Sequence, residues 1–172
     1  MRTCWGRWEQ ELSSNYFYFV HWHYIMANVE IKLTENQQKA FDVLMDDVHT
    51  AIGYWGWAWG GKTFLWIVWL WRMCNQYPWV RYALVRDTIK NIKQTSVISL
   101  EKFYQIYNIP DDMRGKLNNV SNIITFPNWS QILLREWCYL PADPLYNRFW
   151  SLELTWAFVE ESAECPLEWI EI

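Results

Sequence analysis

One short motif constrains this 172-residue chain more than any other feature: residues 56–63 contain the pattern G-x-x-x-x-G-K-T. The pattern is typical of a phosphate-binding loop, in which successive backbone N–H groups form a concave nest for phosphate oxygens. A short apolar run at 50–54 precedes the loop, and a long one follows it at 64–75. We expect a buried strand before the loop and a helix after it, so that the helix N-terminus faces the anion.

The residues of this motif define a nucleotide site. Lys62 is expected to bridge the β- and γ-phosphates, and the Thr63 hydroxyl to ligate Mg²⁺. Gly56, Gly60 and Gly61 complete the expected nucleotide-binding set. The motif thus predicts ATP and Mg²⁺ as cofactors, and the alternative is a chance Gly-Lys-Thr turn.

A pair of acidic residues provides the second chemical feature. The apolar run 152–159 ends in Glu160 and Glu161. A phosphate-loop enzyme needs a carboxylate at the end of a neighbouring buried strand to hold Mg²⁺ through water and to polarise the attacking water. We assign Glu160 to the metal and Glu161 to the role of general base. Taken alone, the same pattern also fits an ordinary strand end with a solvated acidic cap.

Two further residues are candidates for nucleotide contacts. Gln37 lies where many phosphate-loop motors place a glutamine that binds adenine, although it also fits a capping box with Thr34. Arg86 ends a predicted strand at 81–85, at the sheet edge where the nucleotide would lie. It is a candidate for contact with the γ-phosphate, or else an ordinary surface arginine.

Strands and helices alternate from residue 33 onward, which favours an α/β domain with a largely parallel sheet flanked by helices. We expect a single ATPase domain over 29–172, after an N-terminal extension, 1–28, to which we assign no function. An antiparallel hairpin is expected as an addition to the sheet. The expected helices cover 34–48, 62–75 and 91–107, and the expected strands cover 50–54, 81–85, 122–126, 131–135 and 152–159.

The composition is unusual in its tryptophan and glycine content. The chain has 15 Trp and 6 Gly, where average usage would give about 12 Gly. Several tryptophans stand where backbone geometry favours glycine, at turns and in the phosphate loop. We hypothesise that these are glycines in the natural protein, as would follow if a UGA codon for Gly were translated as Trp. The positions concerned are Trp55, Trp57, Trp59, Trp79 and Trp129.

The net charge and the lengths of the apolar runs bear on two classes of partner, nucleic acid and membrane. The net charge of −4 gives no global attraction to nucleic acid or membrane. The apolar runs are shorter than the roughly 20 residues of a membrane span, so we expect no membrane partner. The four scattered cysteines are expected to be reduced thiols.

Taken together, several segments resemble the N-terminal ATPase domain of phage terminase large subunits. The resemblance extends from Leu33 to the end of the chain and is carried by five motifs. These are Leu33-Thr34-x-x-Gln37, the phosphate loop, Ala83-Leu84-Val85-Arg86-Asp87-Thr88, Ile124-Thr125-Phe126-Pro127-Asn128 with Ser130, and Phe158-Val159-Glu160-Glu161-Ser162-Ala163-Glu164. The hairpin phrase is similar to the family pattern F-x-N-G-S, with Trp129 at the glycine position.

The resemblance implies an ATP-driven motor that moves double-stranded viral DNA into a capsid. It implies a homo-oligomeric ring at the procapsid portal in the cytoplasm of an infected bacterium, together with the portal and the small terminase subunit as partners. It assigns adenine to Gln37, phosphate and Mg²⁺ to Lys62 and Thr63, Mg²⁺ to Glu160 and the hydrolytic water to Glu161. Many terminases carry a loop arginine where this chain has Ala58, so an arginine finger is expected from a neighbouring subunit. The family's nuclease domain is absent, and we expect a fragment that does not cut DNA.

Two alternatives remain open at this stage. One is a helicase-like or other nucleic-acid-dependent phosphate-loop ATPase, which would use the same catalytic residues. The other is a non-catalytic product whose phosphate loop is impaired by tryptophan in place of glycine, since indoles at Trp57 and Trp59 would crowd the phosphates.

Overall fold

The structure is a computed structural model that describes residues 29, 31–46, 48–49, 51–53, 61–138, 141–144, 146–150 and 152–161. The chain divides into two compact units, Met1–Lys32 and Leu33–Ile172. The description below concerns the second unit. Within the described residues, no helix has both the length and the apolar character needed to cross a membrane.

Helix α2 (Glu35–Leu44) begins at the predicted capping box. Gln37 N donates to Thr34 Oγ1 (3.3 Å), and Thr34 N donates to Gln37 Oε1 (2.9 Å). This reciprocal pair satisfies two backbone donors that the helix itself leaves without partners. Phe41 is buried on this helix, and the carbonyl of Leu44 accepts a hydrogen bond from Trp69 Nε1 on α3.

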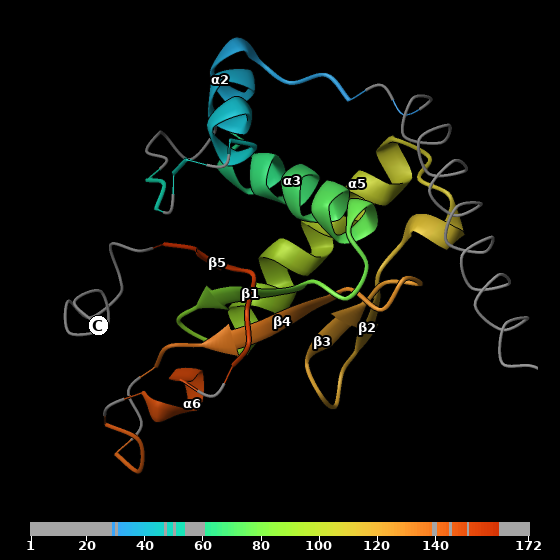
Figure 1. The fold of residues 1–172 in the computed structure, drawn as a ribbon. Helices are drawn as coiled ribbons and strands as arrows, with labels where there is room; N and C mark the ends of the chain where they lie inside the picture. Colours follow the sequence, from blue (N-terminus) through green and yellow to red (C-terminus); the bar gives the residue numbers. More distant parts are fainter. Residues whose placement is uncertain are drawn as a thin grey trace, which may run out of the picture. The chain divides into compact units, whose positions relative to one another are not determined.

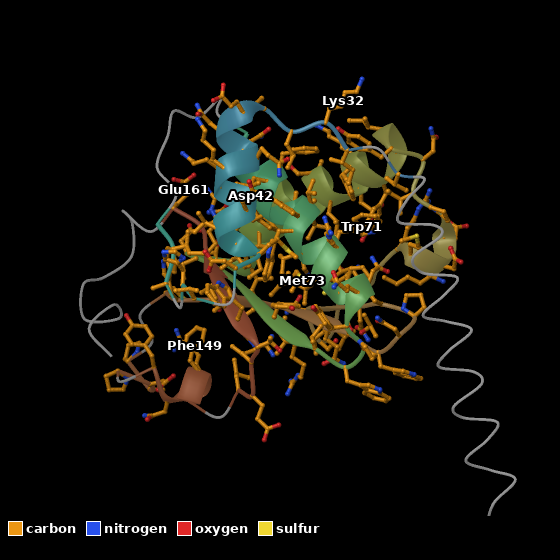
Figure 2. The ribbon with its side chains drawn as sticks, turned by 45° about the horizontal axis from the view of Figure 1, so that its top comes forward. Lys32, Asp42, Trp71, Met73, Phe149 and Glu161 are labelled. Carbon is orange, nitrogen blue, oxygen red and sulfur yellow. The ribbon has the colours of Figure 1, made fainter. Side chains whose placement is uncertain are left out.

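Helix α3 (Lys62–Gln76) forms where the long apolar run predicts it, and α3 and α5 (Ile98–Ile106) lie together on one face of the sheet (Figure 1). Trp71, labelled in Figure 2, is buried, and its ring meets Phe103 of α5 at 5.3 Å and 66°. The Trp71 indole N–H donates to the carbonyl of Met113, so its one polar group is satisfied. Aromatic contacts of this kind fix α5 against α3.

The sheet has five strands in the order β2-β3-β4-β1-β5. Strand β1 (Arg81–Arg86) pairs in parallel with both β4 (Gln131–Glu136) and β5 (Trp156–Val159). Strands β2 (Lys116–Asn118), β3 (Ile123–Thr125) and β4 form an antiparallel meander.

The prediction of a largely parallel sheet is therefore wrong. The sheet is mixed, with parallel pairing confined to the β4-β1-β5 part. The reason is the length of the connections: 119–122 and 126–130 are too short for the crossover that parallel neighbours require, so they can join only antiparallel strands. The predicted hairpin is confirmed as β3–β4, but β2 was not predicted.

The strand predicted at 50–54 does not form in its described part. Residues 51–53 have no regular structure, and both Ala51 and Gly53 are exposed. A strand of this length needs sheet neighbours on which to bury its side chains, and these three residues have none in the sheet. Thr50 and Tyr54 lie outside the described residues.

The helix predicted over 91–107 is interrupted. It consists of α4 (Ile89–Ile92), a π-helical segment η1 (Lys93–Val97) and α5. A π-helical turn holds one more residue than an α-helical turn, so it rotates the side chains that follow it relative to a continuous α-helix. The 3_10 segment η2 (Asp111–Met113) and the short helix α6 (Asn147–Trp150) were not predicted.

The β3–β4 turn is joined to the end of α3. Asn128 Nδ2 donates to the carbonyls of Cys74, Asn75 and Tyr77, at 2.7, 3.4 and 3.4 Å. Ser130 Oγ donates to the same Tyr77 carbonyl at 2.6 Å. The last carbonyls of a helix have no partner within it, and the hairpin turn supplies the donors.

Candidate functional site

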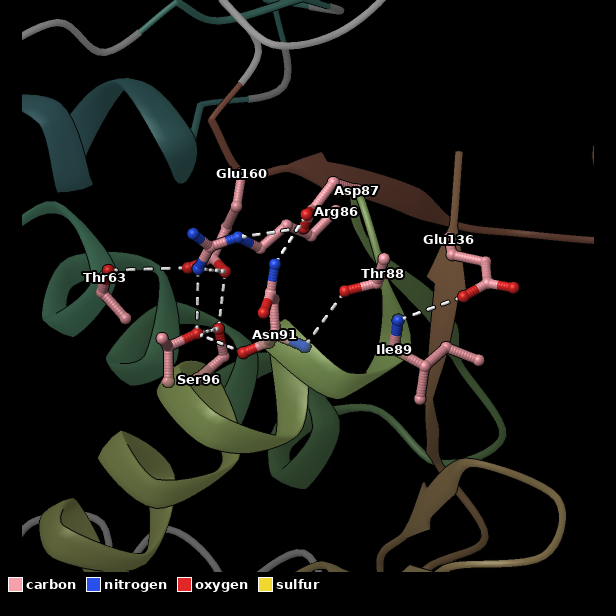
Figure 3. Close-up of polar contacts among 10 residues, drawn as sticks. Thr63, Arg86, Asp87, Thr88, Ile89, Asn91, Ser96, Glu136 and Glu160 are labelled. Carbon is pink, nitrogen blue, oxygen red and sulfur yellow. Dashed lines mark hydrogen bonds and ion pairs between the residues drawn. The ribbon is translucent and has the colours of Figure 1, made fainter. Parts of the chain in front are cut away.

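The candidate site lies where the carboxyl ends of β4, β1 and β5 meet. Arg86 ends β1, Glu136 ends β4, and Glu160 follows β5 directly. The N–H of Glu160 donates to the carbonyl of Val85 (2.9 Å), which extends the β1–β5 pairing by one position. Because parallel strands end at the same edge, this register brings Arg86 and Glu160 side by side, as Figure 3 shows.

Helix α3 brings the end of the phosphate motif to the same edge. Thr63, in its first turn, points its hydroxyl at Glu160, with Thr63 Oγ1 3.5 Å from Glu160 Oε1. These residues are 97 positions apart in the chain. The structure thus places together the two residues that the sequence assigned to Mg²⁺.

Glu160 is held in a nearly closed environment, with only 10% of its side chain exposed. Ser96 Oγ donates a hydrogen bond to Glu160 Oε2 at 2.5 Å, and Arg86 Nη1 lies 3.9 Å from the same oxygen. Burial raises the pKa of Glu160 above its ordinary value. The hydrogen bond from Ser96, the charge of Arg86 and a hydrogen bond from Trp66 oppose that rise, while the charge of Glu161 adds to it.

The guanidinium of Arg86 is fixed by neighbours at the same edge. Arg86 Nη1 donates to Thr95 Oγ1 at 3.0 Å, and Arg86 Nε lies 3.5 Å from Asp87 Oδ1. Asp87 also accepts a hydrogen bond from Asn91 Nδ2 at 2.6 Å. Arg86 ends β1 at the carboxyl edge of the sheet, where the sequence places it; nucleotide binding at this edge and a contact with a γ-phosphate stay predictions.

Gln37 lies beside the phosphate motif rather than away from it. Gln37 Nε2 donates to the carbonyl of Gly61 at 3.1 Å, and Gln37 Oε1 accepts from Thr34 N. The side chain is buried; its oxygen caps α2 through Thr34 N, and its nitrogen joins α2 to the loop. Adenine binding by Gln37 stays a prediction, which would require one of these two groups to make a second bond.

Gly61 meets a conformational demand that the sequence motif does not reveal by itself. It precedes α3 with φ +65°, a left-handed backbone that favours glycine. A Cβ at this position would also collide with Gln37 Nε2. The φ angle therefore requires glycine at position 61, and any side chain there would also displace the amide of Gln37.

The remaining predicted residues are placed only in part. Lys62 is the first residue of α3. Glu161 follows Glu160 and is exposed, with φ +53° (Figure 2); non-glycine residues at such angles are strained and concentrate at functional sites. Gly56 and Gly60 lie outside the described residues, as do Trp55, Trp57, Trp59 and Ala58.

Two residues of this site, Thr95 and Ser96 in the π-helical segment η1, were not predicted from the sequence. A signal was present, because Ser96 lies four residues from each of two buried apolar residues, Ile92 and Leu100. A serine in the apolar stripe of a helix needs a buried hydrogen-bond partner. The partner here is Glu160.

Two of the tryptophans suspected to be glycines have left-handed backbones. Trp79 has φ +65° and Trp129 has φ +69°. Such angles are rare for bulky residues and ordinary for glycine. The geometry agrees with the glycine hypothesis at these two positions, while the codons themselves remain its test.

The donors at this edge are the carboxylate of Glu160 and the hydroxyl of Thr63, oxygen groups of the kind that Mg²⁺ binds. Among the described residues, no three His, Cys, Asp or Glu side chains gather into a metal-binding group. Mg²⁺ commonly takes one or two protein oxygens and completes its shell with water and substrate phosphates. Thr63 Oγ1 and Glu160 Oε1 lie 3.5 Å apart, and they are the two side-chain groups that would hold Mg²⁺ here.

No protein-family model matches this chain, and no curated protein matches it either.

Proposed function

We propose that Leu33–Ile172 is an ATP-hydrolysing domain of the terminase large-subunit type, a motor that packages viral DNA. The observation that carries the proposal is the meeting of Thr63 and Glu160 at the carboxyl edge of the parallel strands. Ligands in sheets of this kind bind outside the carboxyl ends of the strands. The proposal also rests on the sequence resemblance.

In this proposal the N-terminus of α3 binds the phosphates. Its first backbone N–H groups have no partners within the helix and point toward an anion. Lys62, at the first helical position, adds a positive charge where the β- and γ-phosphates would lie. Gln37 holds the loop end through the Gly61 carbonyl, so the backbone donors keep a fixed direction.

The carboxylates of Glu160 and Glu161 would have separate roles in hydrolysis. Glu160 and the Thr63 hydroxyl would hold Mg²⁺, which neutralises developing phosphate charge when bound. Glu161, exposed beside Glu160, would orient and deprotonate the attacking water. Arg86 lies within reach of the same edge and would respond to the loss of the γ-phosphate. The motor would act as a ring on double-stranded DNA at a capsid portal.

The second candidate is a protein that folds but does not hydrolyse ATP. The specific observation in its favour is the left-handed backbone at Trp79 and Trp129, which supports the idea that tryptophan replaces glycine at the suspected positions. The same replacement within 55–59 would place indoles in the space that phosphates need.

One experiment separates these candidates. ATP binding and hydrolysis are measured on this sequence and on a variant with Trp55→Gly, Trp57→Gly, Trp59→Gly and Trp129→Gly. We expect the glycine variant to hydrolyse ATP and its Lys62→Ala derivative to lose hydrolysis. If the glycine variant binds no ATP, the motor proposal fails. If it binds ATP and the original sequence does not, the original sequence is the non-catalytic form. A helicase-like ATPase would instead show stimulation by single-stranded nucleic acid without any effect of duplex ends.

A further inference from the structure

The π-helical segment η1 (Lys93–Val97) contributes two side chains to the site that belong neither to the phosphate motif nor to the acidic strand. Single π-helical turns within longer helices are frequent at functional sites. In this segment, Thr95 and Ser96 are consecutive, yet the hydroxyl of Thr95 contacts Arg86 and that of Ser96 contacts Glu160, two residues of the same sheet edge. Figure 3 shows Ser96 directed at Glu160. The unusual turn thus serves to present two neighbouring hydroxyls to Arg86 and Glu160.

The two hydroxyls contact opposite charges. Thr95 Oγ1 donates to the carbonyl of Asn91 at 2.7 Å, which leaves its lone pairs to accept from Arg86 Nη1 at 3.0 Å. Ser96 Oγ donates to Glu160 Oε2 at 2.5 Å. A cation and a carboxylate that lie 3.9 Å apart are therefore each held by a separate neutral group.

The two oxygens of the Glu160 carboxylate have different neighbours. Glu160 Oε2 receives Ser96 and faces Arg86, while Glu160 Oε1 faces the Thr63 hydroxyl. Ser96 is only 1% exposed, and a buried hydroxyl without an acceptor is costly. The hydrogen bond therefore fixes the rotation of the carboxylate, with one oxygen directed toward Thr63.

We propose that Ser96 is a positioning residue that holds Glu160 Oε1 toward Thr63 and keeps the carboxylate from collapsing onto Arg86. This rests on the proposed function, since it assumes that Thr63 and Glu160 form the Mg²⁺ site. Without the Ser96 hydroxyl, the carboxylate is free to rotate and shorten its contact with Arg86. The metal side then loses its oriented ligand.

The experiment compares two buried serines in the glycine variant described above. Ser96→Ala removes the hydrogen bond to Glu160, and Ser130→Ala removes one to the Tyr77 carbonyl, which lies at the end of α3 away from this edge. The dissociation constant of Mn²⁺, used in place of Mg²⁺, is measured by electron paramagnetic resonance with ADP present. Melting temperatures are recorded for every variant.

We expect Ser96→Ala to raise the Mn²⁺ dissociation constant about tenfold, as outer-shell substitutions at metal sites do. Ser96→Thr, which keeps a hydroxyl, should recover most of the affinity, and Ser130→Ala should lower only the melting temperature. In the Glu160→Gln background, Ser96→Ala should add less than about a twofold effect, since the two residues act as a unit. In turnover, Ser96→Ala should lower kcat and leave the KM for ATP nearly unchanged.

The experiment distinguishes a wrong positioning role for Ser96 from a wrong assignment of ATPase activity. If the parent binds Mn²⁺ with ADP and Lys62→Ala abolishes hydrolysis, but Ser96→Ala matches the parent in Mn²⁺ affinity, the positioning role is wrong and the ATPase stands. An equal loss of affinity in Ser96→Ala and Ser130→Ala would also overturn it, because the effect would then be one of stability. If the parent binds neither nucleotide nor Mn²⁺, the proposed function and this inference fall together.

Discussion

Trp79 and Trp129 stack on each other, with ring centroids 5.7 Å apart and planes inclined by 10°. Each lies in a turn that leads into a parallel strand, β1 or β4, and each has a left-handed backbone. Both side chains are largely exposed, at 70% and 61%. The pair therefore combines an unfavourable backbone at two positions with one favourable ring contact.

This combination predicts a specific pattern in a double-mutant cycle. A left-handed backbone costs a non-glycine residue roughly 1–2 kcal/mol, and an aromatic pair contributes about 0.5–1.5 kcal/mol. Either single change, Trp79→Gly or Trp129→Gly, relieves one strain but loses the stack. The double variant relieves both strains and loses the stack only once, so its gain in the free energy of unfolding should exceed the sum of the singles by the energy of the stack.

Chemical denaturation of the four proteins measures this cycle. Trp129→Ala is the matched control, because alanine also loses the stack but keeps the strained backbone. It should be less stable than Trp129→Gly by about 1 kcal/mol. Equal stability of the alanine and glycine variants would show that position 129 has no need for glycine, and the glycine hypothesis would lose its structural support there.

Gln37 provides a second prediction, because its amide joins the start of α2 to the phosphate motif. Gln37→Ala removes the hydrogen bonds to Thr34 N and the Gly61 carbonyl. Each buried hydrogen bond contributes about 1 kcal/mol, so we expect a loss of about 1–3 kcal/mol in urea denaturation. Gln38→Ala is the control, since Gln38 is exposed and its amide donates to Asp42 on the same helix.

The same variant tests the role of Gln37 in nucleotide choice. If Gln37 acts through the loop, the glycine variant carrying Gln37→Ala should lose affinity for ATP and GTP by the same factor. A selective loss of ATP affinity would instead assign Gln37 to adenine and contradict a purely structural role.

Asn128 gives a third prediction, which concerns the motif that most resembles terminases. Its amide donates to three carbonyls around the end of α3, among them Cys74 at 2.7 Å. Asn128→Ala should lower the free energy of unfolding by about 1–2 kcal/mol, as loss of a helix cap does. Asn119→Ala, at an exposed turn position, should change it by less than about 0.5 kcal/mol. If both variants lost the same free energy of unfolding, Asn128 would have no specific role in capping α3.

The sequence predicts elements well where side-chain pattern and structure have the same cause. The apolar stretch of α3 and the buried run of β1 are both visible as hydrophobic segments, and both form as expected. Strand β2 was missed because it has only three residues, Lys116–Asn118, with one partly buried side chain, Leu117, and alternation indicates a strand only over four or more residues. The parallel arrangement was overestimated because pairing direction depends on connections, not on strand composition.

The site shows the same distinction between local and long-range causes. Thr63 and Glu160 could be predicted because their residue types match a known chemical requirement. The π-helical turn could not be predicted. Ile92, Leu100 and Phe103 keep nearly the spacing of a continuous α-helix, so the apolar pattern does not reveal the extra residue in η1. Ser96 alone indicated it, as a polar residue within that apolar face, and its partner lies 64 positions away.

Glu160 gives the last prediction, which concerns stability as a function of pH. Its pKa in the folded protein is raised above the ordinary value of 4.5, chiefly by burial. A carboxyl with a raised folded pKa binds its proton more tightly in the folded than in the unfolded chain. Its contribution to stability is therefore fully present below about pH 4.5 and is lost as the pH rises through the folded pKa.

Glu160→Gln removes this titration while keeping the size of the side chain. We expect the variant to be more stable than the parent at neutral pH in the absence of metal, and the difference to shrink as the pH falls toward 4.5. The free energy of unfolding, measured by denaturant titration between pH 4 and 8 with chelator present, checks this difference. For Glu153→Gln, at an exposed position, the free energy of unfolding should depend on pH nearly as it does in the parent. A Glu160→Gln curve below the parent at neutral pH would mean that Ser96 and Arg86 outweigh the cost of burial. The carboxylate would then be a stabilising ion-pair partner rather than a charge held at a cost in stability for binding a metal.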